Sequence, residues 1–278
     1  MALFIGTSGF SYEEWRGVFY PAELPKEDFL RYYSMFFPFV ELDFSYYRMP
    51  ESWRLEHLAD STPNDFLFSI KAHKSLTHEP DGNWTTAVEN FKTSLRAASF
   101  KRRLAGILLQ FPYSFHYSDL NRVYLGELTA ELGEFPLFVE FRNAEWSRES
   151  VYQEARKRGL ALVAVDAPDL PGLPNRTFPI TSESGYLRFH GRNAGNWWTG
   201  DNASRYDYAY SDSELEGWKD TILERERETR LLLVAFNNHH QGNAIQDAKR
   251  FKLLTDENRR RAPFLETPAK TDGPWPKG

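Results

Sequence analysis

The chain of 278 residues contains no cysteine and no apolar run approaching the roughly 18 residues of a membrane-spanning helix. The absence of cysteine excludes disulfide bonds, thiolate zinc sites, iron–sulfur clusters and cysteine nucleophiles. The opening segment also lacks the basic region with which a signal peptide begins. We therefore expect a cytoplasmic protein with no membrane partner. Nothing in the sequence indicates an oligomeric state.

The chain also lacks a basic excess and the glycine motifs of nucleotide sites. Its net charge of −5 disfavours a surface that coats duplex nucleic acid, so any anion site must be local. Gly6, Gly9 and Gly17 match neither a dinucleotide nor a P-loop fingerprint, so we predict no nucleotide cofactor. Aromatic residues, by contrast, form 16% of the chain. This excess indicates either extensive ring packing or stacking on a ligand.

Short apolar runs alternate with helical patterns along most of the chain. Continuously apolar strands joined by helical crossovers are typical of a parallel sheet covered by helices. Eight such runs favour closure into a single-domain (β/α)₈ TIM barrel over residues 1–258, with a doubly wound open sheet as the alternative. The predicted strands are residues 3–6, 39–44, 66–72, 105–111, 137–141, 160–165, 186–189 and 231–236.

Three segments depart from the alternation. Four prolines between residues 168 and 179 predict that a loop replaces the sixth helix. Residues 74–83 and 191–211 form two further long loops that follow strands, which places them on the catalytic face of a barrel. Beyond the last helical pattern, the proline-rich residues 259–278 predict a poorly ordered tail.

Polar residues occur two apart near the ends of four predicted strands. Because side chains alternate across a strand, residues two apart share a face, and the outer face of a barrel must pack on helices. We therefore predict that these polar side chains point inward at the carboxyl end of the barrel. The pairs are Glu41 with Asp43, Lys71 with His73, Glu140 with Arg142, and Arg188 with His190. Similar strand-end positions hold Ser8, Gln110, Asp166 and Asn237.

Such a mixture of acids and bases is typical of an active site, since isolated buried charges are costly. We predict a hydrolase or lyase with an anionic substrate bound by Arg142, Arg188 and Arg192. The candidate acids and bases are Glu140, His190, Asp43 and Asp166. Further substrate-binding candidates are Lys71, His73, His78, Gln110, Tyr47, Trp146, Trp197, Asn237 and Asn238. Alternatively, charge-balanced pairs fill the barrel, with Glu41, Lys71 and Glu140 as the first structural members.

A divalent metal is an alternative for the same strand ends, and we predict no other cofactor. Carboxylates and imidazoles suit such an ion, although the neighbouring arginines would repel it and no HExxH motif is present. The possible ligands are His73, His190, Asp43, Glu140 and Asp166. Separately, residues 236–244 lead from the last strand into a helix start, where an anion could bind or Gly242 and Asn243 merely turn the chain.

Aromatic residues after the strands leave two other functions open. Trp197 and Trp198 lie in a loop with little else to bury, so they are the best candidates for stacking on sugars or unpaired bases. A nucleic-acid-binding or endonuclease-like barrel is the first alternative to the enzyme. A non-catalytic barrel that binds a small ligand is the second.

Taken together, the motifs resemble the YecE-like family, from about Phe4 to Leu254. The resemblance implies a TIM barrel and no established reaction, and fold likeness to metal-dependent endonucleases suggests nucleic-acid chemistry only by analogy. Phe10 and Asp43 stand where that family usually has Trp and Asn. The motifs are SGFSYEEWRGVFYP, VELDFSYYRMP, SIKAHKSLTH, LLQFP, VEFRNAEW, LRFHGR and FNNHHQGNA. They single out Glu41, Tyr47, Lys71, His78, Gln110, Glu140, Arg142, Trp146, Arg188, His190, Arg192, Asn237 and Asn238.

Overall fold

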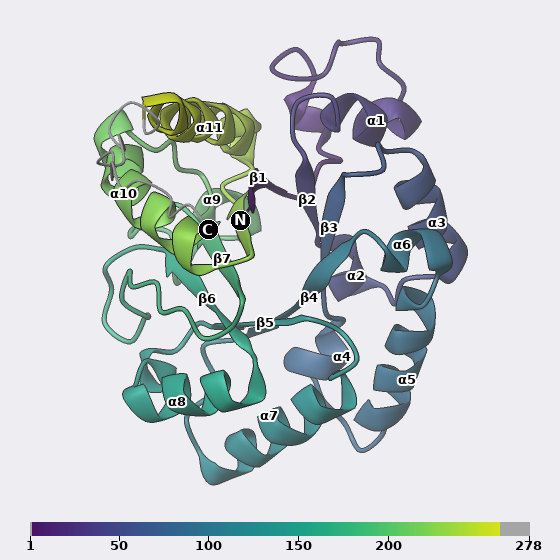
Figure 1. Ribbon diagram of the computed structural model, residues 1–278, viewed down its shortest axis with the longest axis vertical. Coiled ribbons are helices and arrows are strands. Elements are labelled where there is room, and N and C mark those ends of the chain that lie inside the picture. The colour runs from purple at the N-terminus through teal and green to yellow at the C-terminus, as the bar shows by residue number, and fades with distance from the viewer. Residues whose placement is uncertain (1, 262–278) are drawn as a thin grey trace, which may run out of the picture.

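Eight parallel strands close into a single-domain barrel, which confirms the predicted TIM barrel and excludes the open sheet (Figure 1). This computed structural model describes residues 2–261, without the side chains of 202–203 and 257–261. Each strand pairs with its neighbour in sequence, and β1 closes the ring against β8. The strands are β1 Ala2–Ser8, β2 Phe39–Leu42, β3 Leu67–Lys71, β4 Leu104–Phe111, β5 Leu137–Phe141, β6 Ala161–Asp166, β7 Ser184–Phe189 and β8 Leu231–Phe236.

Helices surround the ring of strands (Figure 1). Local caps fix some of their ends: Gly159, whose φ of 66° suits glycine, caps the end of α8, and a capping box formed by Ser211 and Glu214 begins α10. The longer helices are α1 Phe29–Tyr33, α3 Ser52–Asp60, α5 Trp84–Leu95, α7 Asp119–Glu131, α8 Glu149–Arg158, α10 Asp212–Glu228 and α11 Asn243–Arg261. The short ones are α2 Phe44–Tyr47, α4 Lys74–Thr77, α6 Ala98–Lys101 and α9 Asn202–Arg205.

No helix joins β6 to β7 in the described structure, which confirms the proline-rich loop (Figure 1). The other two predicted loops each contain one turn of helix, α4 and α9. Local caps form these turns: the side chain of His73 accepts the backbone amide of Ser75, and that of Asp201 accepts the amide of Ser204. A helix of a single turn is too short to show a helical period in the sequence, so the sequence did not predict these two.

The interior of the barrel is apolar at its amino-terminal end. There Phe39 of β2 and Phe138 of β5 both pack edge-on against the ring of Tyr186 from β7. Leu108, Leu233 and other apolar side chains complete this layer. Because the apolar layer fills the base, the polar side chains two or more residues further along each strand are confined to the carboxyl end of the barrel.

Part of the aromatic excess packs together in the segment between β1 and β2. Tyr20 stacks on Phe29 with ring centroids 3.9 Å apart, and both are buried. Trp15, Phe19 and Tyr33 extend the same cluster. This packing stabilises a segment in which helix α1 has only five residues.

Tyr33 of α1 also completes the joint between β1 and β2. Its hydroxyl oxygen accepts the backbone amide and the hydroxyl of Thr7, each at 2.9 Å, and donates to the carbonyl of Phe39 at 3.0 Å. Direct pairing of the two strands begins only at Thr7 and Val40. A side chain therefore replaces one rung of the backbone ladder.

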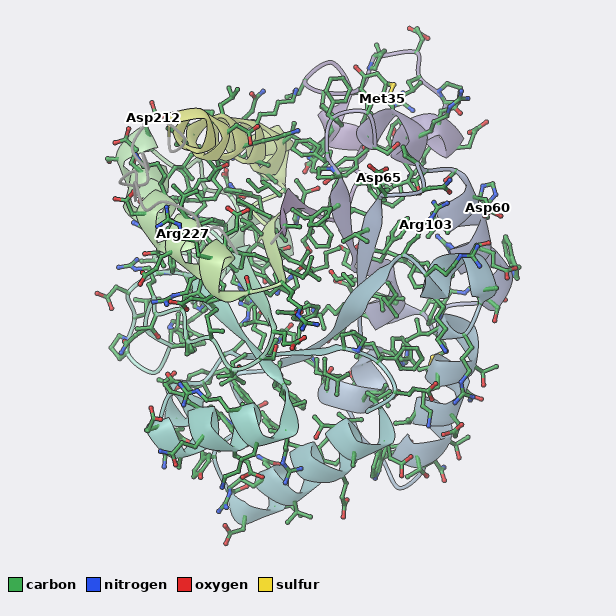
Figure 2. All side chains as sticks on the ribbon, viewed as in Figure 1. Met35, Asp60, Asp65, Arg103, Asp212 and Arg227 are labelled. Carbon is green, nitrogen blue, oxygen red and sulfur yellow. The ribbon has the colours of Figure 1, made fainter. Side chains whose placement is uncertain are left out.

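At the amino-terminal end of the barrel, Arg103 joins α3 to the start of β4. Figure 2 shows Arg103 beside Asp60, near the end of α3. Its guanidinium donates to the carbonyl of Ala59, to the carbonyl and hydroxyl of Thr62, and to the side chain of Asn64. This end of the barrel is thus occupied by structural contacts, which leaves the carboxyl end for a functional site.

The last helix, α11, packs on β1 and β8 and spans Asn243–Arg261, which includes the first three residues of the predicted tail. The rest of the predicted tail, residues 262–278, lies outside the described residues. Across residues 2–261, every helix is too short or too polar to cross a membrane.

The Tyr33 bridge yields a stability prediction. Tyr33→Phe leaves a buried amide and a buried carbonyl without their partner, so we expect a loss of about 1–3 kcal/mol in the free energy of unfolding. Urea denaturation followed by circular dichroism measures this loss. Tyr32→Phe, in the same helix and the same aromatic cluster, is the matched control. Equal stability of the two variants would show that the bridge does not hold β1 to β2.

Candidate functional site

A cavity of about 560 Å³ opens at the carboxyl end of the barrel. Its floor is built from strand ends, and its walls from the aromatic residues of the loops. The floor residues are Ser8, Asp43, Lys71, Gln110, Arg142, Arg188 and Asn237. The walls include Tyr12, Tyr46, Tyr47, His78, Tyr113, Trp197, Trp198, Tyr206 and His239. The strand-end pattern therefore predicted most of the floor.

A buried ion-pair network lies directly beneath the floor. Arg188 of β7 donates from Nη2 to Oε1 of Glu41 and from Nη1 to Oε2 of Glu140, both at 2.6 Å. Both carboxylates are fully buried, and Arg188 is 2% exposed. These contacts connect β2, β5 and β7 across the centre of the barrel. Charges desolvated to this degree are tolerated because they neutralise one another.

Glu41 belongs to this buried network and does not line the cavity. Its other contacts are hydrogen bonds from the hydroxyls of Ser8 and Tyr186. Its ionic partner is Arg188, whereas Lys71 forms no ion pair within 4.0 Å in the described structure. The register explains the difference: Glu41 lies opposite Ser69, so Lys71 lies higher in the barrel, level with Asp43. The predicted structural role of Lys71 is therefore not what the structure shows.

Glu140 lies under the cavity rather than at its surface. Its Oε1 accepts Nε of Arg142 at 2.6 Å and lies 3.2 Å from Nε2 of His190, while Oε2 is held by Arg188. Burial alone would raise the pKa of this carboxyl, but the charges of Arg188 and Arg142 outweigh it and lower the pKa well below the ordinary value. Glu140 therefore stays ionised with both oxygens engaged.

His190 is enclosed in the same way. Burial, together with the charge of Arg142, lowers its pKa from 6.5 to about 3, so the ring is neutral. Its Nδ1 lies 3.0 Å from the amide nitrogen of Asn237 and accepts that donor, which assigns the ring hydrogen to Nε2 and the bond to Glu140. The acid–base roles predicted for Glu140 and His190 do not fit this geometry, because each group is committed to neighbours below the floor.

Lys71 and Arg142 are two of the four cations that line the cavity, the others being Arg188 and Arg205. Burial and the charge of Arg188 lower the pKa of Lys71 to about 8, and its ammonium lies 4.2 Å from the ring centroid of Tyr46. The guanidinium of Arg142 lies 5.7 Å from the ring of Trp197. Arg142 is held by Glu140 through Nε, which leaves its terminal nitrogens towards the cavity.

Tyr206 faces these two cations from the long loop after β7. Its hydroxyl accepts Nη2 of Arg142 at 3.5 Å. Burial opposes ionisation, but the charges of Arg142 and Lys71 outweigh it and lower the pKa of the phenol. The strand-end pattern missed Tyr206 because the alternation rule does not extend to a loop. The only signal was the abundance of aromatic residues in 191–211.

Asp43 is the one carboxylate among the residues that line the cavity. Burial and the neighbouring charge of Glu41 raise its pKa above the ordinary value, against the charge of Lys71. Its Oδ2 accepts the hydroxyl of Tyr12 at 3.3 Å. Asp43 is thus a carboxyl that exchanges a proton more readily near neutrality than an exposed aspartate does.

Other predicted residues line the cavity at its edges. His78 lies against the ring of Tyr46, and burial with the charge of Lys71 lowers its pKa to about 4. Tyr47 stands at the mouth and is 64% exposed, whereas Trp197 is buried in the wall. Gln110 and Asn237 complete the floor. All five were predicted as substrate-binding residues, and the structure brings them together.

Asp166 and Arg192 form a separate cluster outside the barrel. Arg192 donates to both oxygens of Asp166, at 2.9 and 2.6 Å, and Asp166 also accepts Tyr210 and Trp218 of the α10 region. Neither residue lines the cavity. In the sequence ALVAVD both faces of β6 are apolar, so the pattern did not show that Asp166 points outward. The predicted catalytic and anion-binding roles do not fit this position.

Three further predicted substrate residues also lie away from the cavity. Trp146 is stacked 4.3 Å from Phe141 and donates to a backbone carbonyl. The side chain of Asn238 donates to Asp247 and to a carbonyl, which ties β8 to α11. His73 caps α4. Each is explained by local packing or hydrogen bonding.

The metal interpretation requires three or more acidic or imidazole groups at one point. Within the described residues, no such group of three converges. His190 and Glu140 touch, but Asp166 lies outside the barrel, and His73 bonds to Ser75. The five proposed ligands therefore do not form one coordination sphere in this structure.

The network under the floor yields a prediction for Glu140→Gln. This change leaves two guanidinium groups buried with less than their compensating charge, so we expect a loss of about 3–5 kcal/mol in the free energy of unfolding. Denaturant titration measures the loss. Glu154→Gln, which breaks the exposed pair with Arg158, is the matched control and should leave stability unchanged within error. Equal effects would show that the buried network is not stabilising.

His190 yields a prediction about pH. Its pKa in the folded protein, about 3, is below that of an unfolded chain, so the unfolded state binds the proton more tightly and acid favours unfolding. This stability is full above about pH 6.5 and falls by up to about 1.4 kcal/mol per pH unit towards the folded pKa. His190→Asn should reduce that slope between about pH 6 and pH 4, whereas the exposed His57→Asn should not. Identical slopes would mean that His190 is not buried neutral.

Comparison with known proteins identifies relatives of the same length. The family model described as "Protein of unknown function DUF72" matches residues 4–272. The UPF0759 protein YunF of Bacillus subtilis is 30% identical over 270 residues, which cover 91% of this chain and 95% of that protein.

Solved structures agree with the barrel. A DUF72 family protein from Thermotoga maritima is 37% identical, with a TM-score of 0.86 over 92% of this chain and 100% of that chain. A DUF72 family protein from Enterococcus faecalis, at 23% identity and a TM-score of 0.80, shows the same fold over 92% of this chain and 96% of that chain. These relatives are similar along nearly their whole length. The chain therefore belongs to the uncharacterised DUF72 family.

Proposed function

We propose that the cavity is the active site of an enzyme with an anionic substrate. One observation carries the proposal: the lining of one cavity includes four cationic side chains and a single carboxylate, Asp43. The cations are Lys71, Arg142, Arg188 and Arg205. Glu140 and Glu41 compensate Arg142 and Arg188 from beneath the floor, whereas Lys71 has no ion pair within 4.0 Å in the described structure. A phosphate or carboxylate group on the substrate supplies a negative charge for the cations that remain in the cavity.

Asp43 and Tyr206 are the proposed proton carriers. The surroundings shift the two pKa values in opposite directions: that of Asp43 is raised and that of Tyr206 is lowered. A pair of titratable groups displaced in this way is a common basis for acid and base roles in one site. Hydrolysis and lyase chemistry both use such a pair. We assign no step to a metal or cofactor.

The exposed aromatic rings at the mouth of the cavity favour a substrate with a flat or sugar-like part. Tyr47 is 64% exposed and Trp198 is 48% exposed, and both rings line the opening. Exposed rings beside a cationic floor also favour a second candidate, the binding of single-stranded nucleic acid. The net charge of −5 argues against that candidate outside the cavity itself.

Two smaller proposals accompany the main one. We propose that the YecE-like family, which the motifs resemble, and the DUF72 family are one family, because the motif-bearing segment lies within the matched range of 4–272. We also propose a cytoplasmic location, on the basis of a chain without cysteine.

Anion titration tests the proposed site. Arg142→Gln should weaken the binding of inorganic phosphate or citrate by roughly tenfold to a hundredfold, because one charged hydrogen bond contributes about 1.5–3 kcal/mol. Isothermal titration calorimetry at low salt measures the affinity. Arg148→Gln is the matched control, since Arg148 lies on the same loop against Tyr117, away from the cavity. Absence of saturable binding to the wild-type protein, or equal affinity in both variants, would overturn the anion site.

The same proteins separate the candidate functions. Turnover of phosphorylated or carboxylated compounds that is lost in Asp43→Asn supports the enzyme, and a bound ligand recovered unchanged supports a binding protein. Salt-dependent binding of an oligonucleotide that requires the rings of Tyr47 and Trp198 would favour the nucleic-acid candidate instead.

A further inference from the structure

Lys71 lines the cavity, and the binding of an anion does not use the nucleophilic chemistry of its amine. It stands at the end of β3 with its ammonium over the ring of Tyr46 at 4.2 Å. In the described structure no carboxylate lies within 4.0 Å of it, although Asp43 is near enough to interact electrostatically. Surface lysines of this chain, such as Lys74, pair with carboxylates at 2.7 Å. A lysine kept apart from a counter-ion in a cavity is unusual for a purely structural residue.

The surroundings of Lys71 favour a neutral, nucleophilic amine. Cationic Arg188 approaches from β7 and cationic Arg142 from β5, and both are fixed by carboxylates that point away from the cavity. A lysine amine beside other cations in a desolvated site is the usual arrangement for attack on a carbonyl group. The remaining polar groups around it are Glu41 of β2, Asp43 after it, Tyr46 of α2, His78 after α4, and Tyr206 of the long loop.

We propose that Lys71 forms an imine with the carbonyl carbon of an anionic aldehyde or 2-oxo acid. The proposal rests on the proposed function and specifies its substrate class: the anionic group is held by Arg142, and the carbonyl carbon lies at the Lys71 amine. Imine formation makes the site a lyase rather than a hydrolase, since the iminium accepts electrons from a bond broken at the adjacent carbon.

The step balances without any further reactant. The nitrogen lone pair forms a C–N bond as the carbonyl π bond opens, and one proton passes from the nitrogen to the oxygen to give a carbinolamine. The hydroxyl takes up a second proton, the C–O bond breaks and water leaves as the nitrogen lone pair forms a double bond to carbon. Loss of the remaining N–H proton converts this iminium to the neutral imine. The net change is an amine and a carbonyl compound converted to an imine and water, with no oxidation or reduction. The hydroxyl of Tyr206 and the carboxyl of Asp43 are the cavity groups placed to carry these protons.

Pyridoxal 5′-phosphate is a suitable probe, because it carries an aldehyde, a phosphate and a flat ring. Equimolar probe is added to the wild-type protein, the imine is reduced with borohydride, and peptides are mapped by mass spectrometry. We expect Lys71 to be labelled ahead of all other lysines, and inorganic phosphate to suppress that label. The rate of labelling at Lys71 should rise with pH around 8, whereas exposed lysines should respond near their ordinary pKa of about 10.

Lys71→Arg keeps the charge and should remove the selective label while phosphate still binds. Lys92 is the matched internal control, because it is buried but paired with Glu89 at 2.6 Å, and it should stay unlabelled. Labels spread over exposed lysines with Lys71 unmodified would overturn the imine, even if phosphate binds normally. If the wild-type protein does not bind phosphate, that result would instead overturn the anion site. The wild-type peptide map decides the question even if the variant does not fold.

Discussion

The structure of the site depends on one buried arginine. Arg188 bonds at 2.6 Å to Glu41 and to Glu140, and so connects three strands through the middle of the barrel. Three desolvated charges would be strongly unfavourable if any one were missing, because each relies on the others for compensation. Neighbouring residues add hydrogen bonds to this network: the hydroxyls of Ser8 and Tyr186 donate to Glu41, and Nε2 of His190 donates to Glu140. The polar carboxyl end of the barrel is therefore a single cooperative unit above an apolar base.

This arrangement determines which charges reach the cavity. Glu41 and Glu140 each direct an oxygen at Arg188, and the second oxygen of Glu140 accepts Arg142, so both carboxylates compensate arginines. Lys71 and Arg205 also line the cavity, where Asp43 is the only carboxylate among the lining residues. The local field is then positive although the whole chain is negative. A site of this kind concentrates an anion without making the protein a general binder of polyanions. It also accounts for the lowered pKa of the Tyr206 phenol.

The sequence predicted the barrel well, because eight apolar runs and the crossovers between them are local patterns. It also predicted that polar side chains two apart would share the inner face. It could not predict how far each side chain lies above the apolar layer, because that distance depends on the register between strands. Ser69 rather than Lys71 lies opposite Glu41. It could not orient Asp166, because both faces of β6 are apolar. Tyr206 was invisible to the same rule, since the long loop brings it back over the floor without any periodicity.

Height also separates the roles within each shared motif. In VELDF, Glu41 belongs to the buried network and Asp43 to the cavity; in VEFRN, Glu140 belongs to the network and Arg142 to the cavity. The two members of a pair lie two residues apart on the same inner face, so their spacing does not separate their roles. Loss of the network member would act through the stability of the barrel, and loss of the cavity member through the proposed anion site. The distance above the apolar layer, set by strand register, is the property that assigns a side chain to the framework or to the cavity.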